Sequence, residues 1–326
     1  MIKLNDYLYQ GDTVFKILKR YRADLESNAL KEGNSIDLAH AEFLSQFSDL
    51  LEHNEFLTSQ SQRIREFYKY MAGTYPYLAF TFKGRIKSLI RAEEKFNGYV
   101  VEQVHDYYAE HGEFPSDEMV KSRISYFRDL IAYRIVISVP KCNIKDGENK
   151  EEVEMKVLYE VANAMPDFLE QRGFTAEPAK RKESVKSPLL DDKVREYYRD
   201  YVQNPSGFGY KSLHITLFDN LSRSYVEIQI RTKEMDDFAE IGPANHISYE
   251  KRQESERTRR SDIPKGVCKY FDEADDRLTA LQDLELSKLD VNMFAAVSNS
   301  LVNDGCGLIK GRLILPFEHL SRFQND

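Results

Sequence analysis

The sequence has few cysteines and no long apolar run. Cys142, Cys268 and Cys306 are far apart and form no Cys-x-x-Cys pair, which excludes a disulfide framework and a zinc site built on cysteine. No stretch approaches the roughly 18 apolar residues of a membrane-spanning helix. The first residues carry charges where a signal peptide would have its apolar part. We therefore expect a cytoplasmic protein with no membrane partner.

The composition is that of a globular protein. Hydrophobic residues make up 41% of the 326 residues and charged residues 31%, which excludes a largely disordered chain and fits one large domain or two modest ones. The net charge of -8 argues against a protein that coats nucleic acid by charge alone. Basic charge is nevertheless concentrated locally, with five basic and two acidic side chains in residues 82–95. This pattern predicts a small polyanionic ligand, and the alternative is a solvated face.

Hydrophobic periodicity divides the chain into three parts, with no internal repeat. The helical segments that it predicts are 35–70, 85–110, 151–171, 235–251 and most of 264–326. The strands that it predicts are 129–139 and a hairpin of 210–218 with 225–231. We therefore expect a helical N-terminal region over 1–80, a mixed α/β domain over 81–253 and a mainly helical C-terminal extension over 254–326.

The first segment that could carry chemistry is GRIKSLIRAEEK, residues 84–95. On a helix, Lys87, Arg91 and Lys95 are four residues apart and share one face. Like charges at this spacing repel by a few tenths of a kcal/mol per pair. An anion that spans the three cations would reverse this cost, and a triphosphate is long enough to do so. The segment predicts a triphosphate-binding ladder, unless it is a solvated helix.

Two carboxylates lie at or within apolar strands. Asp129 opens one strand, and strand alternation places Glu227, Gln229 and Arg231 on one face of another. An acidic group in an apolar strand needs a partner. The partner could be magnesium, which takes oxygen ligands and substrate phosphates, or a nearby arginine such as Arg134 or Arg231. Asp129 and Arg134 are five residues apart, so they share a face only if Asp129 lies before the strand.

A proline- and glycine-containing loop precedes the strand that begins with Tyr210 and carries His214. An aromatic side chain at such a junction can stack on a nucleobase. The alternative for both residues is packing in the core.

Five segments of the chain resemble, in order, the motifs of the RelA/SpoT-type alarmone synthetases. The matching residues are Arg85, Lys87, Lys95, Asp129, Arg134, Asp200, Tyr201, Pro205, Gly209, Tyr210, Ser212, Leu213, His214, Glu227, Gln229, Arg231, Thr232, Ala239, Glu240, Gly242, Ala244, His246 and Tyr249. Ser206, Phe208 and Arg91 stand where the family has Lys, Asn and Ser. The resemblance covers about residues 81–252 and shows no hydrolase domain, which indicates a stand-alone, synthetase-only member.

The resemblance implies an α+β fold, with a nucleotidyltransferase-like mixed sheet of about five strands, packed helices and helical extensions. It also implies a GTP pyrophosphokinase of the stringent response, which transfers the β,γ-pyrophosphoryl group of ATP to the 3'-hydroxyl of GDP or GTP and yields (p)ppGpp and AMP. Two alternatives are transfer to another acceptor, an adenosine nucleotide or the 3'-end of tRNA, and a nucleotide-binding module without catalysis. Small members of this family often form oligomers, so the resemblance makes a homo-oligomer possible.

The resemblance also implies roles for the site residues. Those expected to bind ATP are Arg85, Lys87, Arg91, Lys95 and Arg134. Asp129 and Glu227 are expected to be the catalytic, magnesium-binding pair, with Glu227 also positioning or deprotonating the attacking hydroxyl. The residues expected to bind the acceptor nucleotide are Tyr210, His214 and Gln229, with Tyr210 stacking on the base.

Overall fold

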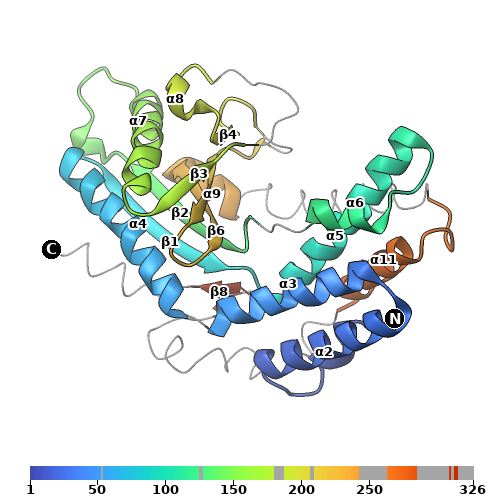
Figure 1. Ribbon diagram of the computed structural model, residues 1–326. Helices are drawn as coiled ribbons and strands as arrows, with labels where there is room; N and C mark the ends of the chain where they lie inside the picture. The colour runs from blue at the N-terminus through green and yellow to red at the C-terminus, as the bar shows by residue number, and fades with distance from the viewer. Residues whose placement is uncertain are drawn as a thin grey trace. The chain divides into compact units, whose positions relative to one another are not determined.

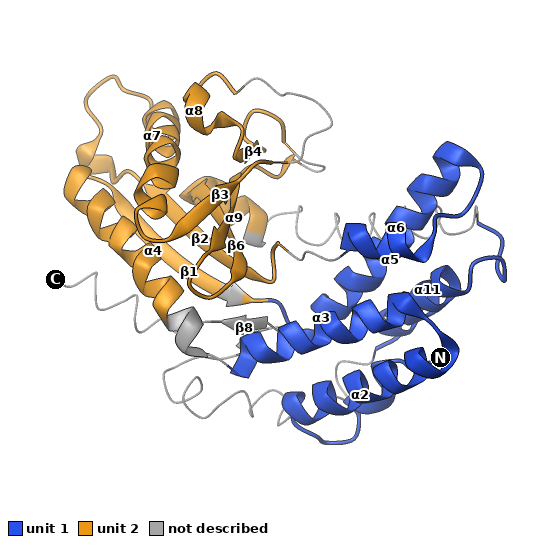
Figure 2. Ribbon diagram, in the orientation of Figure 1, with its two compact units in different colours: residues 1–54, 87–127, 253–316 blue, residues 55–86, 128–252, 317–326 orange. Residues whose placement is uncertain are grey.

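The computed structural model describes most of the chain, and its described residues fall into two compact units (Figures 1 and 2). The described residues are 1–52, 54–124, 128–179, 187–205, 209–241, 263–284, 308–309 and 312–314. Contacts between residues assign 1–54, 87–127 and 253–316 to one unit and 55–86, 128–252 and 317–326 to the other. We call them the helical unit and the sheet unit. This division cuts across the three consecutive regions expected from the sequence.

The helical unit is assembled from three separate chain segments. Its helices are α1 (Asn5–Leu8), α2 (Val14–Glu32), α3 (Ser35–Glu52), α5 (Leu89–His111), α6 (Asp117–Ile124) and α11 (Lys269–Gln282). Two short strands, β7 (Leu308–Ile309) and β8 (Arg312–Ile314), pair antiparallel. Helix α5 begins at the N-cap Ser88, whose side chain accepts a hydrogen bond from the Arg91 amide, and it ends at Gly112 with φ 72°.

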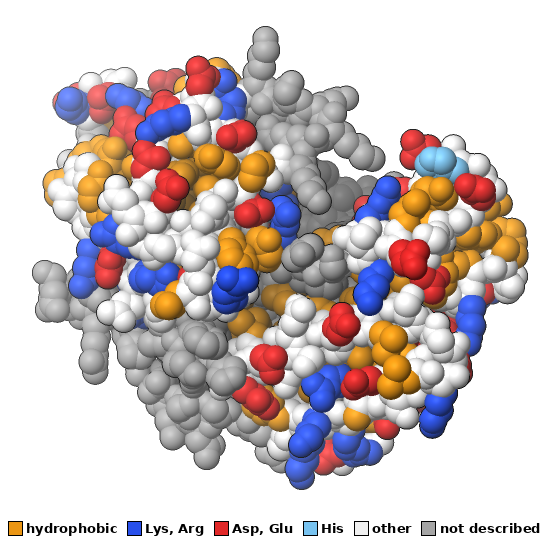
Figure 3. All heavy atoms as spheres, in the orientation of Figure 1, with side chains coloured by type: hydrophobic (Ala, Val, Ile, Leu, Met, Phe, Trp, Pro, Cys, Tyr) orange, Lys and Arg blue, Asp and Glu red, His pale blue; other side chains and the backbone are white. Residues whose placement is uncertain are grey.

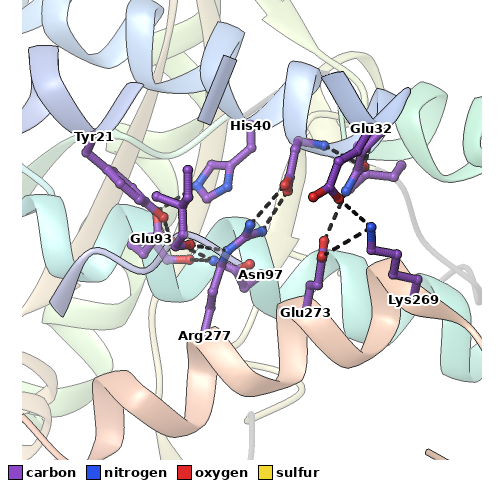
Figure 4. Close-up of polar contacts among 12 residues, drawn as sticks. Tyr21, Glu32, His40, Glu93, Asn97, Lys269, Glu273 and Arg277 are labelled. Atoms are coloured by element: carbon purple, nitrogen blue, oxygen red, sulfur yellow. Dashed lines mark hydrogen bonds and ion pairs between the residues drawn. The ribbon is translucent and has the colours of Figure 1, made fainter. Parts of the chain in front are cut away.

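A network of buried polar side chains joins four helices of this unit (Figure 4). Glu93 of α5 accepts hydrogen bonds from Tyr21 of α2 at 2.6 Å and from His40 of α3 at 2.7 Å. Arg277 of α11 donates both terminal nitrogens to Asp37 of α3, at 2.8 and 3.0 Å. All five side chains are at most 3% exposed. Charge-assisted hydrogen bonds thus link helices from the beginning, middle and end of the chain to one another.

This network predicts that the helical unit loses stability in acid. Burial alone would raise the pKa of Glu93, but His40, Tyr21 and Arg277 together lower it below its ordinary value. A carboxylate with a lowered pKa contributes stability that is present above about pH 4.5 and is lost as the pH falls. The gap in unfolding free energy between the wild type and Glu93→Gln should therefore narrow from pH 7 to about pH 3.5 in urea titrations. Glu102→Gln, on the exposed side of the same helix, is the control; a gap that stays constant would contradict the prediction.

The sheet unit contains a mixed sheet. Its strands are β1 (Ala79–Ile86), β2 (Ile131–Ser138), β3 (Phe174–Glu177), β4 (Tyr198–Asp200), β5 (Leu213–Asp219) and β6 (Ser224–Thr232). The strand order is β3-β5-β6-β2-β1, and β4 pairs with β5. β2 and β6 are parallel, whereas the other pairs are antiparallel. The helices of this unit are α4 (Asn54–Thr74), α7 (Lys150–Glu170), α8 (Asp192–Arg195) and α9 (Lys233–Ile241), with a 3-10 turn at Lys141–Asn143.

The two faces of the sheet differ in chemistry because side chains alternate along each strand. One face is apolar and fully or nearly buried, with Tyr133, Ile228 and Ile215 in one register row across β2, β6 and β5. The ring of Phe82 on β1 stacks on Tyr133. The opposite face carries charged and amide side chains. In one register row, Lys83, Arg134, Gln229, His214 and Arg199 are successive neighbours on β1, β2, β6, β5 and β4. The fold thus gathers polar residues from five strands on one surface.

The expected fold class is confirmed, with local differences. The strand over 129–139, the helix over 151–171 and the hairpin are present as β2, α7 and β5–β6. The predicted helix over 85–110 is wrong at its start, because β1 continues through Ile86. The irregular stretch 172–199 contains β3, α8 and β4. The predicted helix over 235–251 lies outside the described residues beyond Ile241. Among the described helices, none combines the length and the apolarity needed to cross a membrane.

Candidate active site

The polar face of the sheet carries a closed ring of five hydrogen-bonded side chains. Glu227 accepts a hydrogen bond from Gln229 at 2.7 Å, and the Gln229 carbonyl accepts one from Arg231 at 2.8 Å. Arg231 also donates to the Tyr210 hydroxyl. Tyr210 is 2.8 Å from His214 Nε2, and His214 Nδ1 is 3.4 Å from Glu227. This ring connects the predicted catalytic carboxylate with all three predicted acceptor-binding residues.

Glu227 is held in its ionised form. Burial alone would raise the pKa of this carboxyl group, but His214, Arg199 and Gln229 together hold it well below the usual range. Burial lowers the pKa of His214, which therefore stays neutral at neutral pH. A neutral His214 can donate from Nδ1 to Glu227 and accept from the Tyr210 hydroxyl at Nε2. Glu227 is thus a fixed negative charge on the polar face.

The cation beside Glu227 is Arg199 of β4. Its Nη2 atom is 2.5 Å from Glu227 Oε2. Burial alone would lower the pKa of Arg199, but the charges of Glu227, Tyr201 and Asp129 raise it. The alternative to magnesium, an ion pair with a nearby arginine, is thus present at Glu227, with Arg199 in place of Arg134 or Arg231. Asp129 and Glu227, the two predicted magnesium ligands, thus both raise the pKa of this one guanidinium group.

Arg134 and Arg231 instead share a carboxylate on α9. Asp236 Oδ1 is 3.1 Å from Arg134 and 3.3 Å from Arg231, and Asp236 Oδ2 is 3.8 Å from Lys83. Arg231 also lies over the Tyr210 ring, with its Cζ atom 4.9 Å from the ring centroid. Cationic side chains from β1, β2 and β6 are therefore gathered around one buried acid.

Asp129 lies two residues before β2, so strand alternation does not force its side chain onto the face opposite to that of Arg134. The residues of β2 that face Glu227 and Gln229 in the register are Ala132 and Arg134. Arg85 lies on β1 opposite Ala132, in the same register row as Glu227. The sheet thus places the backbone positions of Arg85, Arg134 and Glu227 on neighbouring strands.

The predicted ladder on α5 is only partly correct. Because α5 begins at Leu89, Lys87 precedes the helix, and only Arg91 and Lys95 share its face. Arg91 pairs with Glu94 at 2.6 Å, and the Lys95 ammonium lies 5.2 Å from the centroid of the Tyr99 ring. These residues belong to the helical unit, whereas the other predicted site residues belong to the sheet unit. Their ATP-binding role stays a prediction.

Sequence reasoning missed Arg199, Lys83 and Asp236. Arg199 directly precedes a motif residue, Asp200, and Lys83 is two residues before Arg85, so alternation along β1 was a usable signal. Asp236 carried no signal, because its role depends on how α9 returns to the sheet. Ser206, Phe208, Gly242, Ala244, His246 and Tyr249 lie outside the described residues.

Two carboxylates of the sheet unit could hold a magnesium ion jointly with phosphate. In the described part of the chain, no group of three or more His, Cys, Asp or Glu side chains is arranged to hold a metal. Magnesium, however, usually takes one or two carboxylates and completes its shell with water and substrate phosphates. Asp129 and the ionised Glu227 supply such a pair of oxygen donors, and both already interact with the same cation, Arg199.

The visible surface does not gather charge of one sign. On the face drawn in Figure 3, basic and acidic side chains alternate over both units.

The mixed sheet and its charged face define an α+β protein with a candidate anion- and metal-binding site. A family model described as the region found in RelA / SpoT proteins matches residues 84–254, just over half of the chain. The chain belongs to the RelA/SpoT family.

The relatives include enzymes of plants and bacteria. The chain is 44% identical over 55 residues to GTP pyrophosphokinase rsh of Brucella ovis, covering 17% of this chain and 7% of that protein. It is 30% identical over 127 residues to the chloroplastic GTP diphosphokinase CRSH3 of Oryza sativa subsp. japonica, covering 36% and 22%. It thus spans less than a quarter of either relative. A crystal structure of small alarmone synthetase 1 from Bacillus subtilis, bound to its product pppGpp, is similar with 19% identity and a TM-score of 0.33, covering 74% of this chain and 95% of that one.

Proposed function

We propose that this chain is an ATP-dependent GTP pyrophosphokinase of the cytoplasm. It transfers the β,γ-pyrophosphoryl group of ATP to the 3'-hydroxyl of GDP or GTP, which gives AMP and (p)ppGpp. The observation that supports this best is the hydrogen-bonded ring around Glu227, built from motif residues of the RelA/SpoT family. The names of the two curated relatives agree with it.

The proposed chemistry follows the general logic of phosphoryl transfer, which is mostly positioning and charge stabilisation. Asp129 and Glu227 would hold magnesium, which neutralises the transferred phosphates when bound. Because the pKa of Glu227 is held low, this carboxylate is a weak base and acts better as a fixed charge than as a proton acceptor. Arg134 would bind the donor, together with Arg85 and the cations of residues 87–95.

The acceptor loop departs from the family pattern, since Ser206 and Phe208 replace polar family residues there. The test is to incubate the protein with labelled ATP, magnesium and either GDP, GTP, ADP or tRNA. We expect AMP and a pyrophosphorylated guanosine nucleotide with GDP and GTP. Product with tRNA or ADP alone would contradict the guanosine acceptor. No AMP with any acceptor would indicate a nucleotide-binding module.

Replacing Tyr210 should impair acceptor binding selectively. A base–aromatic stack contributes roughly 1 to 3 kcal/mol, so Tyr210→Ala should raise the KM for GDP by about 10- to 100-fold while the KM for ATP stays unchanged. Tyr210→Phe keeps the ring and removes the hydroxyl group that contacts Arg231 and His214. It should retain an acceptor KM near that of the wild type. An equal rise in both variants would assign the effect to the hydroxyl network and exclude stacking.

A further inference from the structure

Asp236 is the one described carboxylate that interacts with cations from three strands of the polar face. Its Oδ1 atom contacts Arg134 of β2 at 3.1 Å and Arg231 of β6 at 3.3 Å. Its Oδ2 atom is 3.8 Å from Lys83 of β1. No sequence motif singled out this residue.

The position of Asp236 is fixed by the chain around it. Helix α9 follows β6 directly, and the Thr232 hydroxyl at the end of β6 accepts a hydrogen bond from the Met235 amide at 3.3 Å. This is the capping arrangement that starts a helix at a defined residue. Asp236 lies in the first turn and is only 5% exposed. Its carboxylate therefore has little freedom relative to β6.

Asp236 also links two groups of predicted substrate-binding residues. Arg134 is expected to bind ATP. Arg231, through the Tyr210 hydroxyl and the Gln229 carbonyl, supports residues expected to bind the acceptor. One carboxylate oxygen is thus shared by the cation of the donor group and the cation that supports the acceptor group.

We propose that Asp236 is a positioning residue, which holds Arg134 and Arg231 so that donor and acceptor are aligned for pyrophosphoryl transfer. The inference rests on the proposed function and adds to it a residue that contacts neither substrate. Asp236 acts through the two guanidinium groups.

Removal of the Asp236 charge has two opposing consequences. The variant Asp236→Asn leaves Lys83, Arg134 and Arg231 in place but raises the local charge by one, which favours binding of a polyanion. At the same time, the guanidinium groups lose the charged acceptor that fixes them, because the amide keeps only one, weaker acceptor oxygen and adds an NH2 donor beside the cations. A misplacement of about 1 Å in such a site can cost about 100-fold in rate. The positioning role therefore predicts a fall in kcat without a loss of ATP affinity.

The experiment compares three purified full-length variants with the wild type, using ATP, magnesium and the best acceptor of the panel above. For Asp236→Asn we expect kcat to fall about 100-fold and the KM for ATP to stay within about threefold or to decrease. Asp236→Glu keeps the charge and should recover part of kcat. Asp237→Asn is the matched control, because the neighbouring Asp237 pairs only with Lys233 among the described residues and is 48% exposed. It should behave as the wild type.

The outcomes separate this inference from the proposed function. A kcat of Asp236→Asn within about threefold of the wild type overturns the inference. So does a fall in apparent kcat that matches the loss of folded protein measured by circular dichroism, because partial unfolding lowers the concentration of active enzyme at an unchanged KM and indicates a merely structural role. A wild-type chain that releases no AMP contradicts the proposed function and the inference with it. The first two results leave the proposed function intact.

Discussion

Replacing Glu227 with glutamine is expected to lower kcat by about three orders of magnitude, or roughly 4 kcal/mol of transition-state stabilisation. The glutamine has the same shape but no charge, so it cannot serve as a magnesium ligand of comparable strength. In the ring, its amide group meets the Gln229 amide, where the carboxylate accepted a hydrogen bond. This mismatch should cost only about 1 to 3 kcal/mol of folding stability.

The measurement is single-turnover AMP release at saturating ATP, with circular dichroism to confirm that the variant is folded. Glu170→Gln, at the exposed end of α7, is the control and should keep the wild-type rate. A Glu227→Gln variant with a rate near that of the wild type would refute the role of Glu227 in holding the metal. The proposed reaction would then need another carboxylate.

Replacing Arg277 with methionine is expected to destabilise the helical unit by about 3 to 5 kcal/mol. The methionine leaves Asp37 as an unpaired charge at 2% exposure. The double variant Asp37→Leu with Arg277→Met should recover most of this loss, because a buried ion pair replaced by apolar side chains is often neutral in stability. Urea titration of each variant gives the free energies of unfolding.

A surface ion pair on the same helix provides the control for this prediction. Lys269 pairs with Glu32 and is 64% exposed, so Lys269→Met should leave the free energy of unfolding nearly unchanged. A loss below about 1 kcal/mol in Arg277→Met itself would show that α11 does not depend on the buried pair.

The sequence predicted those features that depend on local pattern. Apolar, β-branched runs located β2 and the β5–β6 hairpin, and strand alternation correctly grouped Glu227, Gln229 and Arg231, which are hydrogen-bonded in the structure. The family motifs added Tyr210 and His214 to the same site. Apolar runs and strand alternation can be predicted from the sequence because each depends only on residues of a single strand.

The errors arise where the outcome depends on residues distant in sequence. The segment AFTFKGRI forms β1 because it pairs with β2, more than 40 residues away, whereas its last residues continue the helical pattern of α5 when read alone. Similarly, the partner of Glu227 is Arg199 on a strand that pairs with β5, and the partner of Arg134 is Asp236 on a helix. Residue spacing cannot show which of several arginines forms an ion pair with a given carboxylate, because that depends on the order of the strands in the sheet.

The helical unit is built from three separate segments of the chain, and this has a consequence for synthesis on the ribosome. Asp37 is translated early, but its partner Arg277 follows 240 residues later. Until α11 has emerged, α3 exposes an unpaired acid and α5 exposes the apolar surface that α11 covers. Release of a chain shortened before α11 should therefore yield a product that chaperones and proteases recognise as unfinished, even when the sheet strands are complete.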